Sequence, residues 1–249
     1  MTKWHEADEF WETMAPVMFT PGRRQAAPEE AARAVRLAGV KSPAPVLDLC
    51  CGPGRHSAEW ARLGFDVTGV DRTEAYLEEA RRHSAGLKAT FVRDDMRQFC
   101  RPETYEAVFN LYNSFGYFED PADDRRVLEN IRESLVPGGR VVIEVIGKEF
   151  VARELRERSW MEWDGGFLLE SCRIRNNWSW LENRWILIHS GGIDECTWGH
   201  RLYAASEFVA LLTDCGFVGP EIYGDLDGRT YDRAAVRLVA VARKAQTAS

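Results

Sequence analysis

The chain has 249 residues, 45% of them hydrophobic, and can therefore bury the core of one α/β domain that carries an inserted subdomain. Its net charge of −7 argues against an extended phosphate-binding surface, so nucleic acid is not an expected partner. The acidic, aromatic start MTKWHEADEFWE is unlike a signal peptide, and no apolar run approaches the length of a membrane span, which indicates a cytoplasmic protein with no membrane partner.

The N-terminal segment, residues 1–27, is too apolar to be a solvated tail, because residues 4–19 hold several aromatic and methionine side chains. These side chains either cover one face of a sheet or fold as a lid over a ligand, with Phe19 and Arg23 beside it. A helix is predicted next, from Pro28 to Val40. A proline opens it, glutamates occupy its first turn where the helix dipole favours them, and a glycine ends it.

Residues 46–60, VLDLCCGPGRHSAEW, predict a strand, a glycine turn and a helix, the first unit of a doubly wound sheet whose turn contacts a nucleotide-like ligand. A turn that binds a pyrophosphate avoids carboxylates and keeps its N–H donors. Here Asp48 lies late in the strand, and Pro53, between Gly52 and Gly54, has no N–H. The turn therefore favours a cationic ligand, and S-adenosylmethionine fits better than NAD.

Two further strands are predicted at Phe65–Val70 and Lys88–Val92, with a helix between them. Asp71 ends the first of these strands, and Asp95 follows the second. Together with Asp48 they gather carboxylates at the carboxyl edge of the sheet, where ligands bind in open α/β folds. The simpler alternative for Asp71 is a helix cap. For Asp95 the alternative is that the adjacent Asp94 faces the ligand in its place.

The sheet continues with a fourth strand at Tyr105–Leu111, which alternates poorly and is therefore expected to be buried on both faces. A helix opening at Pro121 ends at a PGG turn, and Arg140–Ile146 is predicted as the fifth strand. Glu144 in this strand is either paired with a basic side chain or faces the substrate. Phe217–Tyr223 and Ala235–Ala242 are predicted to be closing antiparallel strands.

Residues 159–203 differ in character from the rest, because they are rich in tryptophan and β-branched residues and are interrupted by turn signals. The predicted turns lie at 164–166, 176–177, 182–183 and 191–192. This pattern indicates an antiparallel meander of three or four strands, inserted over the active site. Its tryptophans could form the core of the small sheet, a homodimer contact or the wall of an apolar substrate pocket.

Several segments resemble the motifs of the class I S-adenosylmethionine-dependent methyltransferases: the turn after residue 46, the acidic residue at 71, FVRDDM, YEAVFNLYNSFGYFED and LVPGGRVVIEV. The resemblance covers residues 40–147 well and the rest loosely. It implies a Rossmann-like, doubly wound sheet of seven strands, mostly parallel, with an antiparallel C-terminal strand. It divides the chain into the lid, a cofactor-binding domain of residues 28–158 and 204–249, and the inserted subdomain.

The resemblance also implies a cofactor site. Asp71 would bind both ribose hydroxyls, Asp95 would cap the adenine amino group, and Met96 would pack on the adenine ring. The full set of expected cofactor residues is Phe19, Arg23, Asp48, Cys50, Gly52, Gly54, His56, Asp71, Arg72, Asp95, Met96, Asn110 and Leu111. Cys50 departs from the family, which has glycine there, and a Cβ at this place is tolerable only if φ is negative.

Residues that follow the fourth strand should reach the transferable methyl group, so Tyr112, Asn113 and Tyr117 are expected to face the substrate, together with Glu144 and Trp198. If the acceptor must lose a proton, the candidates are His200 and Tyr112. A structural role for His200 is the alternative.

The sequence therefore predicts an enzyme that methylates an amine or hydroxyl of a small molecule, such as a natural product. The alternatives are the same fold and cofactor used for a cyclisation, an isomerisation or binding only, and a nicotinamide oxidoreductase. The six cysteines form no CxxC pair and have no histidine at metal-ligand spacing, so reduced thiols and no metal are expected.

Overall fold

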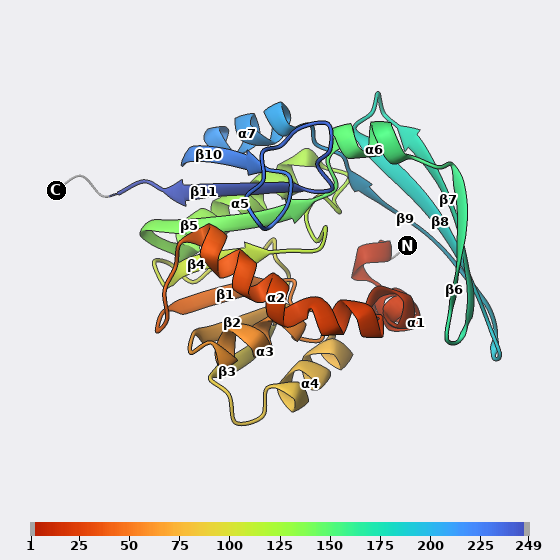
Figure 1. The fold of residues 1–249 in the computed structure, drawn as a ribbon, viewed down its shortest axis with the longest axis horizontal. Helices are drawn as coiled ribbons and strands as arrows, with labels where there is room; N and C mark the ends of the chain where they lie inside the picture. The colour runs from red at the N-terminus through yellow and green to blue at the C-terminus, as the bar shows by residue number, and fades with distance from the viewer. Residues whose placement is uncertain (1–2, 247–249) are drawn as a thin grey trace.

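The main sheet has seven strands, and β1 lies inside it between β4 and β2 (Figure 1). The computed structural model describes residues 3–246. The strand order is β10-β11-β5-β4-β1-β2-β3, and only β11 runs against the others, pairing antiparallel with both β5 and β10. The strands are β1 (Pro45–Leu49), β2 (Asp66–Asp71), β3 (Ala89–Arg93), β4 (Tyr105–Asn110), β5 (Leu135–Val145), β10 (Phe217–Tyr223) and β11 (Leu238–Lys244).

Helices cover both faces of this sheet, which explains why its strands are apolar on both sides. The helices are α2 (Pro21–Ala38) and α3 (Arg55–Arg62) on one face, α5 (Pro121–Ser134) and α7 (Ala205–Asp214) on the other, and α4 (Glu74–His83) beside β3. Alanines of α2 and Trp60 of α3 pack on β1, β2 and β4. On the other face, Val127 of α5 and Phe208 of α7 belong to a second core. The predicted fold class is confirmed.

The helix predicted to open at Pro28 opens instead at Pro21, which follows Thr20 as N-cap. Pro28 lies inside α2 without ending it, so the residue chosen as a start signal was the wrong proline. Gly39 ends the helix with a left-handed backbone, as expected. The predicted lid boundary at residue 27 therefore falls within α2.

Two smaller corrections concern the C-terminal half of the sheet. β5 begins at Leu135, ahead of Arg140, because the PGG segment belongs to the strand and is accommodated by a register shift against β4. The two closing strands pair antiparallel with each other, as predicted, but the second of them, β11, begins at Leu238 and not at Ala235.

Residues 158–201 form a second, separate sheet of four antiparallel strands (Figure 1). Its strands are β6 (Arg158–Trp163), β7 (Gly166–Arg175), β8 (Trp180–His189) and β9 (Gly192–Arg201), and the short helix α6 (Lys148–Glu154) precedes them. Three of the predicted turns join these strands. The turn predicted at 182–183 was wrong, since β8 runs straight through both residues.

The N-terminal segment lies between the main sheet and the meander (Figure 1). It consists of a short turn of 3₁₀ helix, η1 (Trp4–Glu6), and α1 (Asp8–Met18). Phe10, Met14 and Val17 of α1 pack on Leu168 and Leu187 of the meander. Its aromatic and methionine side chains thus join the inserted sheet to the rest of the chain. No helix of the described part is both long and apolar enough to cross a membrane.

The packing of Phe109 on Trp60 yields a stability prediction. Phe109 is fully buried in β4, with its ring centroid 4.3 Å from that of Trp60. Phe109→Ala should lower the free energy of unfolding by about 3–5 kcal/mol, because it leaves a cavity between sheet and helix. Urea denaturation would measure this. Leu63→Ala, at a residue 45% exposed, is the control and should change stability by less than about 0.5 kcal/mol; equal losses would contradict the predicted core.

Candidate active site

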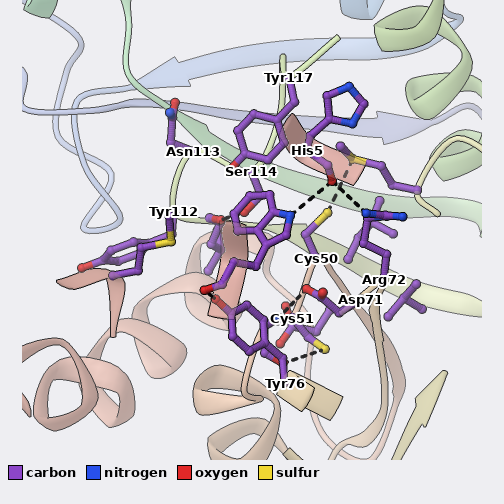
Figure 2. A pocket seen from close by; sticks show the side chains of 18 of the residues that line it. His5, Cys50, Cys51, Asp71, Arg72, Tyr76, Tyr112, Asn113, Ser114 and Tyr117 are labelled. Carbon is purple, nitrogen blue, oxygen red and sulfur yellow. Dashed lines mark hydrogen bonds between the residues drawn. The ribbon is translucent and has the colours of Figure 1, made fainter. Parts of the chain in front are cut away.

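A cavity of about 300 Å³ lies at the carboxyl edge of the main sheet, where β1, β2 and β4 end (Figure 2). Its walls come from the turn after β1, the end of β2, the loop after β4, the N-terminal segment and the meander. Most of the wall is apolar, and acidic side chains lie at the strand ends. A pocket of this kind is the default ligand site of an α/β fold.

The turn after β1 is held by hydrogen bonds to the neighbouring strand. The Cys51 amide donates to Val70 O at 2.9 Å, and the Gly52 amide donates to Asp71 Oδ2 at 2.9 Å. Gly54 has φ +73, and an added Cβ would lie 2.7 Å from Ala80 Cβ, so only glycine allows α3 and α4 to approach here. Gly52 lines the cavity, whereas Gly54 does not.

Cys50 contradicts the expectation of a negative φ. Its φ is +63, and its side chain lines the cavity with Sγ 3.5 Å from Met96 Sδ. A left-handed backbone costs a non-glycine residue about 1–2 kcal/mol, and the bonds of Cys51 and Gly52 hold the turn in place regardless. Burial raises the pKa of the Cys50 thiol well above its ordinary value, so the cavity contains a neutral thiol.

Asp48 is buried at the end of β1, where Ser57 Oγ donates to its Oδ2. Burial raises the pKa of Asp48 to about 7, and the Ser57 hydrogen bond and the Arg55 charge oppose that rise only in part. A positive charge placed in the cavity would favour the ionised form. Asp48 is therefore suited to a cationic ligand.

Asp71 ends β2 and accepts from two backbone amides, Gly52 through Oδ2 and Thr73 through Oδ1 at 3.0 Å. A carboxylate has about four acceptor positions, so two remain for a ligand. Burial raises the pKa of Asp71, and the backbone donors oppose this. The neighbouring Arg72 donates to His5 O at 3.0 Å, which ties the N-terminal segment to this strand end (Figure 2).

Asp95 and Met96 line the cavity on the far side of Asp71. Arg97 donates to both carboxylate oxygens of Asp95 and holds the pKa of that group below its usual value against the effect of burial. Asp94, the alternative for the same role, also lines the cavity. The structure brings both carboxylates to the site and leaves the choice between them open.

Tyr112 forms the opposite end of the cavity, and it and Asn113 both have positive φ, +64 and +61. The Arg55 guanidinium lies 4.1 Å and that of Arg23 5.2 Å from the centroid of the Tyr112 ring. Glu30 binds both Arg55 and His56. A positive φ at a residue other than glycine persists only where the surroundings fix it, and Cys50, Tyr112 and Asn113 all have one at the candidate site.

Four predicted site residues do not line the cavity: Gly54, Asn110, Glu144 and His200. Asn110 is fully buried and donates to Leu49 O at 3.0 Å. Glu144 pairs with Arg237 at 3.0 Å, which is the structural alternative considered for it. His200 is buried behind Trp198, with ring centroids 5.6 Å apart, and is not placed to act as a base in the cavity. The other predicted residues do line it.

Sequence reasoning missed several lining residues, among them Trp4, His5, Trp11, Tyr76 and Trp185. The first three belong to a segment whose aromatic content was recognised, but the pattern could not say which side chains face a ligand. Tyr76 is buried on α4, and its hydroxyl donates to the carbonyl of Trp11 and so joins α4 to α1. The density of aromatic residues was the only signal available.

The residues present fit S-adenosylmethionine. Carboxylates at three strand ends suit ribose hydroxyls and cationic groups, whereas a pyrophosphate needs free amides and free basic side chains. Arginines that line the cavity are already engaged, Arg55 by Glu30 and Arg237 by Glu144. Strand order, glycine turn and acidic strand ends together define the Rossmann-like fold of the class I S-adenosylmethionine-dependent methyltransferases.

Comparison with known proteins agrees with this class. Residues 46–139 match the family described as methyltransferase domain. The solved structure of the CcbJ methyltransferase from Streptomyces caelestis is 23% identical with a TM-score of 0.75, covering 88% of this chain and 90% of that one. The S-adenosylmethionine-bound structure of CalS10, an amino pentose methyltransferase of Micromonospora echinaspora, is 22% identical with a TM-score of 0.66, covering 94% and 96%.

A curated relative from Streptomyces venezuelae, named dTDP-3-amino-3,4,6-trideoxy-alpha-D-glucopyranose N,N-dimethyltransferase, is 30% identical over 129 residues. That alignment covers 51% of this chain and 54% of the relative. Residues 46–139 therefore carry a methyltransferase domain, and the chain shares the fold of the S-adenosylmethionine-dependent methyltransferases. S-adenosylmethionine is its cofactor.

Replacing Asp71 tests the cofactor site. Each charge-assisted bond to a ribose hydroxyl is worth roughly 1.5–3 kcal/mol, so Asp71→Asn should weaken S-adenosylhomocysteine binding by about two orders of magnitude. Titration calorimetry measures this. Asp66→Asn, at the exposed opposite end of β2, is the control and should bind as the wild type does. Equal affinity of both variants would refute the assignment of Asp71.

The raised pKa of Asp48 predicts that cofactor binding depends on pH. This pKa of about 7 in the free protein should fall when a cation binds, so binding releases a proton below pH 7. S-adenosylmethionine affinity should therefore rise by up to ~10-fold per pH unit towards pH 7 and then level off. Asp48→Asn should remove the slope, and S-adenosylhomocysteine, which lacks the sulfonium charge, should show a shallower one. Calorimetry between pH 5.5 and 8.5 would measure it, and identical slopes for both ligands would speak against a role for Asp48.

Proposed function

We propose that this enzyme methylates an amine on a small molecule with a largely apolar body. The observation that carries the proposal is the composition of the cavity beyond the strand ends. Tryptophan and tyrosine side chains form the wall there, and no side chain of that wall, within residues 3–246, is poised as a base.

The cofactor end would hold S-adenosylmethionine through residues already described. Asp71 would accept from the ribose, Asp95 or Asp94 from the adenine amino group, and Asp48 would offset positive charge near the turn. When bound, the cofactor supplies a methyl group already activated by its sulfonium, so the protein's task is to position the acceptor and exclude water.

The acceptor end is formed by Trp4, Trp11, Tyr117 and Trp198, all of which line the cavity. The Trp4 ring centroid lies 5.0 Å from that of Tyr117, 5.6 Å from Trp11 and 5.7 Å from Trp198. These rings join the N-terminal segment, the loop after β4 and the meander into one wall. Such a wall excludes water, and ring faces attract the ammonium that forms when an amine is methylated.

The titratable groups of the described part do not supply an evident base for a hydroxyl acceptor. Burial raises the pKa of Tyr117, so its hydroxyl stays protonated. His56 has its pKa lowered to about 4 by burial and is bound to Glu30. The His5 ring packs in a T-shaped arrangement with Phe118, with centroids 5.1 Å apart, and burial lowers the pKa of His5. An amine needs only to arrive neutral, which suits this cavity better.

The relatives support an amine as well. The name of the Streptomyces venezuelae protein specifies N,N-dimethylation of an amino sugar nucleotide, and CalS10 is described as an amino pentose methyltransferase. The arginines that line the cavity are engaged by the protein itself, Arg55 by Glu30 and Arg237 by Glu144, so the proposal extends only to the amine and not to a diphosphate. Methylation of a hydroxyl, or a reaction without methyl transfer, are the other outcomes of the test below.

Two accompanying proposals concern the setting of the enzyme. The six cysteines are all free thiols, which suits a cytoplasmic location. The outer face of the meander exposes Trp160 and Ile193, at 66% and 69%, and these would serve a homodimer contact. Neither proposal is needed for the chemistry.

The test is formation of S-adenosylhomocysteine with matched acceptors. Benzylamine-type and phenol-type compounds of equal size should differ, with turnover only for the amines. The pH profile of kcat/KM should follow the pKa of each amine used, since the amine itself must be neutral, and should shift when the amine is changed. Turnover confined to phenols, or a profile that stays fixed across amines, would contradict the proposal.

A further inference from the structure

The inner face of the meander carries a polar band between two apolar clusters. On one side, Leu181 of β8 packs with Val151 and Leu202; on the other, Leu187 packs with α1. Asn183 and His200 lie between these clusters, exposed by only 7% and 1%. Alternate residues of a strand share a face, so Asn183 points the same way as its apolar neighbours on β8.

The strand register places these polar side chains together. Asn183 is paired with Trp198, and Leu181 with His200. Asn183 and His200 are therefore diagonal neighbours on one face, within reach of a single bridging group. The charged side chains at 182 and 184 alternate onto the opposite, outer face.

The polar atoms of this band have no hydrogen-bond partner among the described residues. They are Asn183 Nδ2, Trp198 Nε1, and both ring nitrogens of His200. Burying such groups unpaired is costly, and native proteins rarely tolerate it without a water or ligand to satisfy them. Four such atoms on neighbouring residues of one face therefore indicate a polar group that this fold does not itself supply.

The band lies directly behind the wall of the cavity. Trp198 lines the cavity on its other side, and the His200 ring stacks on the Trp198 indole at 5.6 Å and 23° between planes. Ile146 also lines the cavity and packs against the cluster of Leu181 and Leu202. Movement of one indole would thus connect the polar band with the acceptor end.

We propose that Asn183 and His200 form a polar subsite for the methyl acceptor, reached past Trp198, which takes a neutral hydroxyl-bearing part of that molecule. A hydroxyl both donates and accepts, which matches an amide N–H on one side and a neutral imidazole on the other. Burial lowers the pKa of His200 to about 4, so its ring is uncharged at neutral pH.

This subsite rests on the proposed function and refines it. The acceptor would carry its amine towards the cofactor and a hydroxyl at its far end, and two anchor points would fix its orientation for in-line transfer. His200 thereby takes a binding role in place of the base role considered for it.

The experiment compares cyclohexylamine with the positional isomers of aminocyclohexanol, titrated into the S-adenosylhomocysteine-loaded protein and followed by protein NMR. The variants are His200→Phe and Asn183→Leu, with Arg184→Gln on the outer face as control. One neutral hydrogen bond corresponds to about tenfold in affinity. The wild type and the control should bind at least one isomer about tenfold more tightly than cyclohexylamine, and both subsite variants should lose this difference.

A thermal melt accompanies the titration. Because the polar atoms are unpaired in the free protein, neither apolar variant should lower Tm, whereas loss of a structural hydrogen bond would. Equal binding of all amines by the wild type, or a preference that survives both variants, overturns the subsite and leaves a water-filled band. The same amines tested for turnover judge the proposed function separately, since an amine that binds without being methylated contradicts that function and not the subsite.

Discussion

The hydrogen bond from the Gly52 amide to Asp71 Oδ2, 2.9 Å long, fixes the geometry on which the site depends. It joins the turn after β1 to the end of β2, and the Cys51 amide repeats this connection on Val70. Because the turn is held from the neighbouring strand, it keeps a left-handed residue at position 50 and places the start of α3 beside the cavity. Asp71 is at once part of the scaffold and the carboxylate offered to the ligand.

Charge decides what this scaffold binds. Asp48, Asp71 and Asp95 meet at one edge of a low-dielectric cavity, and burial alone would drive each towards its neutral form. Basic side chains at the same edge are engaged by other partners, Arg97 by Asp95 and Arg55 by Glu30. A ligand that brings positive charge and hydroxyl donors satisfies this edge, whereas a diphosphate would add to the repulsion.

The sequence predicted the sheet and the cofactor residues well because both depend on local patterns. Apolar strands, the glycine turn and the spacing to Asp71 can be seen within single units of the fold. The acceptor side could not be predicted in this way, since it brings η1, α1, the loop after β4 and the meander together from distant parts of the chain. Pro28 misled because Pro21 is an equally good start signal. His200 misled because it shares a sheet face with Trp198, but the Trp198 indole stacks on its ring and only Trp198 lines the cavity.

The most direct test of the account is a crystal structure with S-adenosylhomocysteine. The account predicts the ribose hydroxyls within hydrogen-bonding distance of the Asp71 carboxylate, the adenine between Met96 and the N-terminal segment, and the sulfur facing the wall formed by Tyr117 and Trp198. A cofactor bound elsewhere, or in this cavity with its ribose away from Asp71, would contradict it.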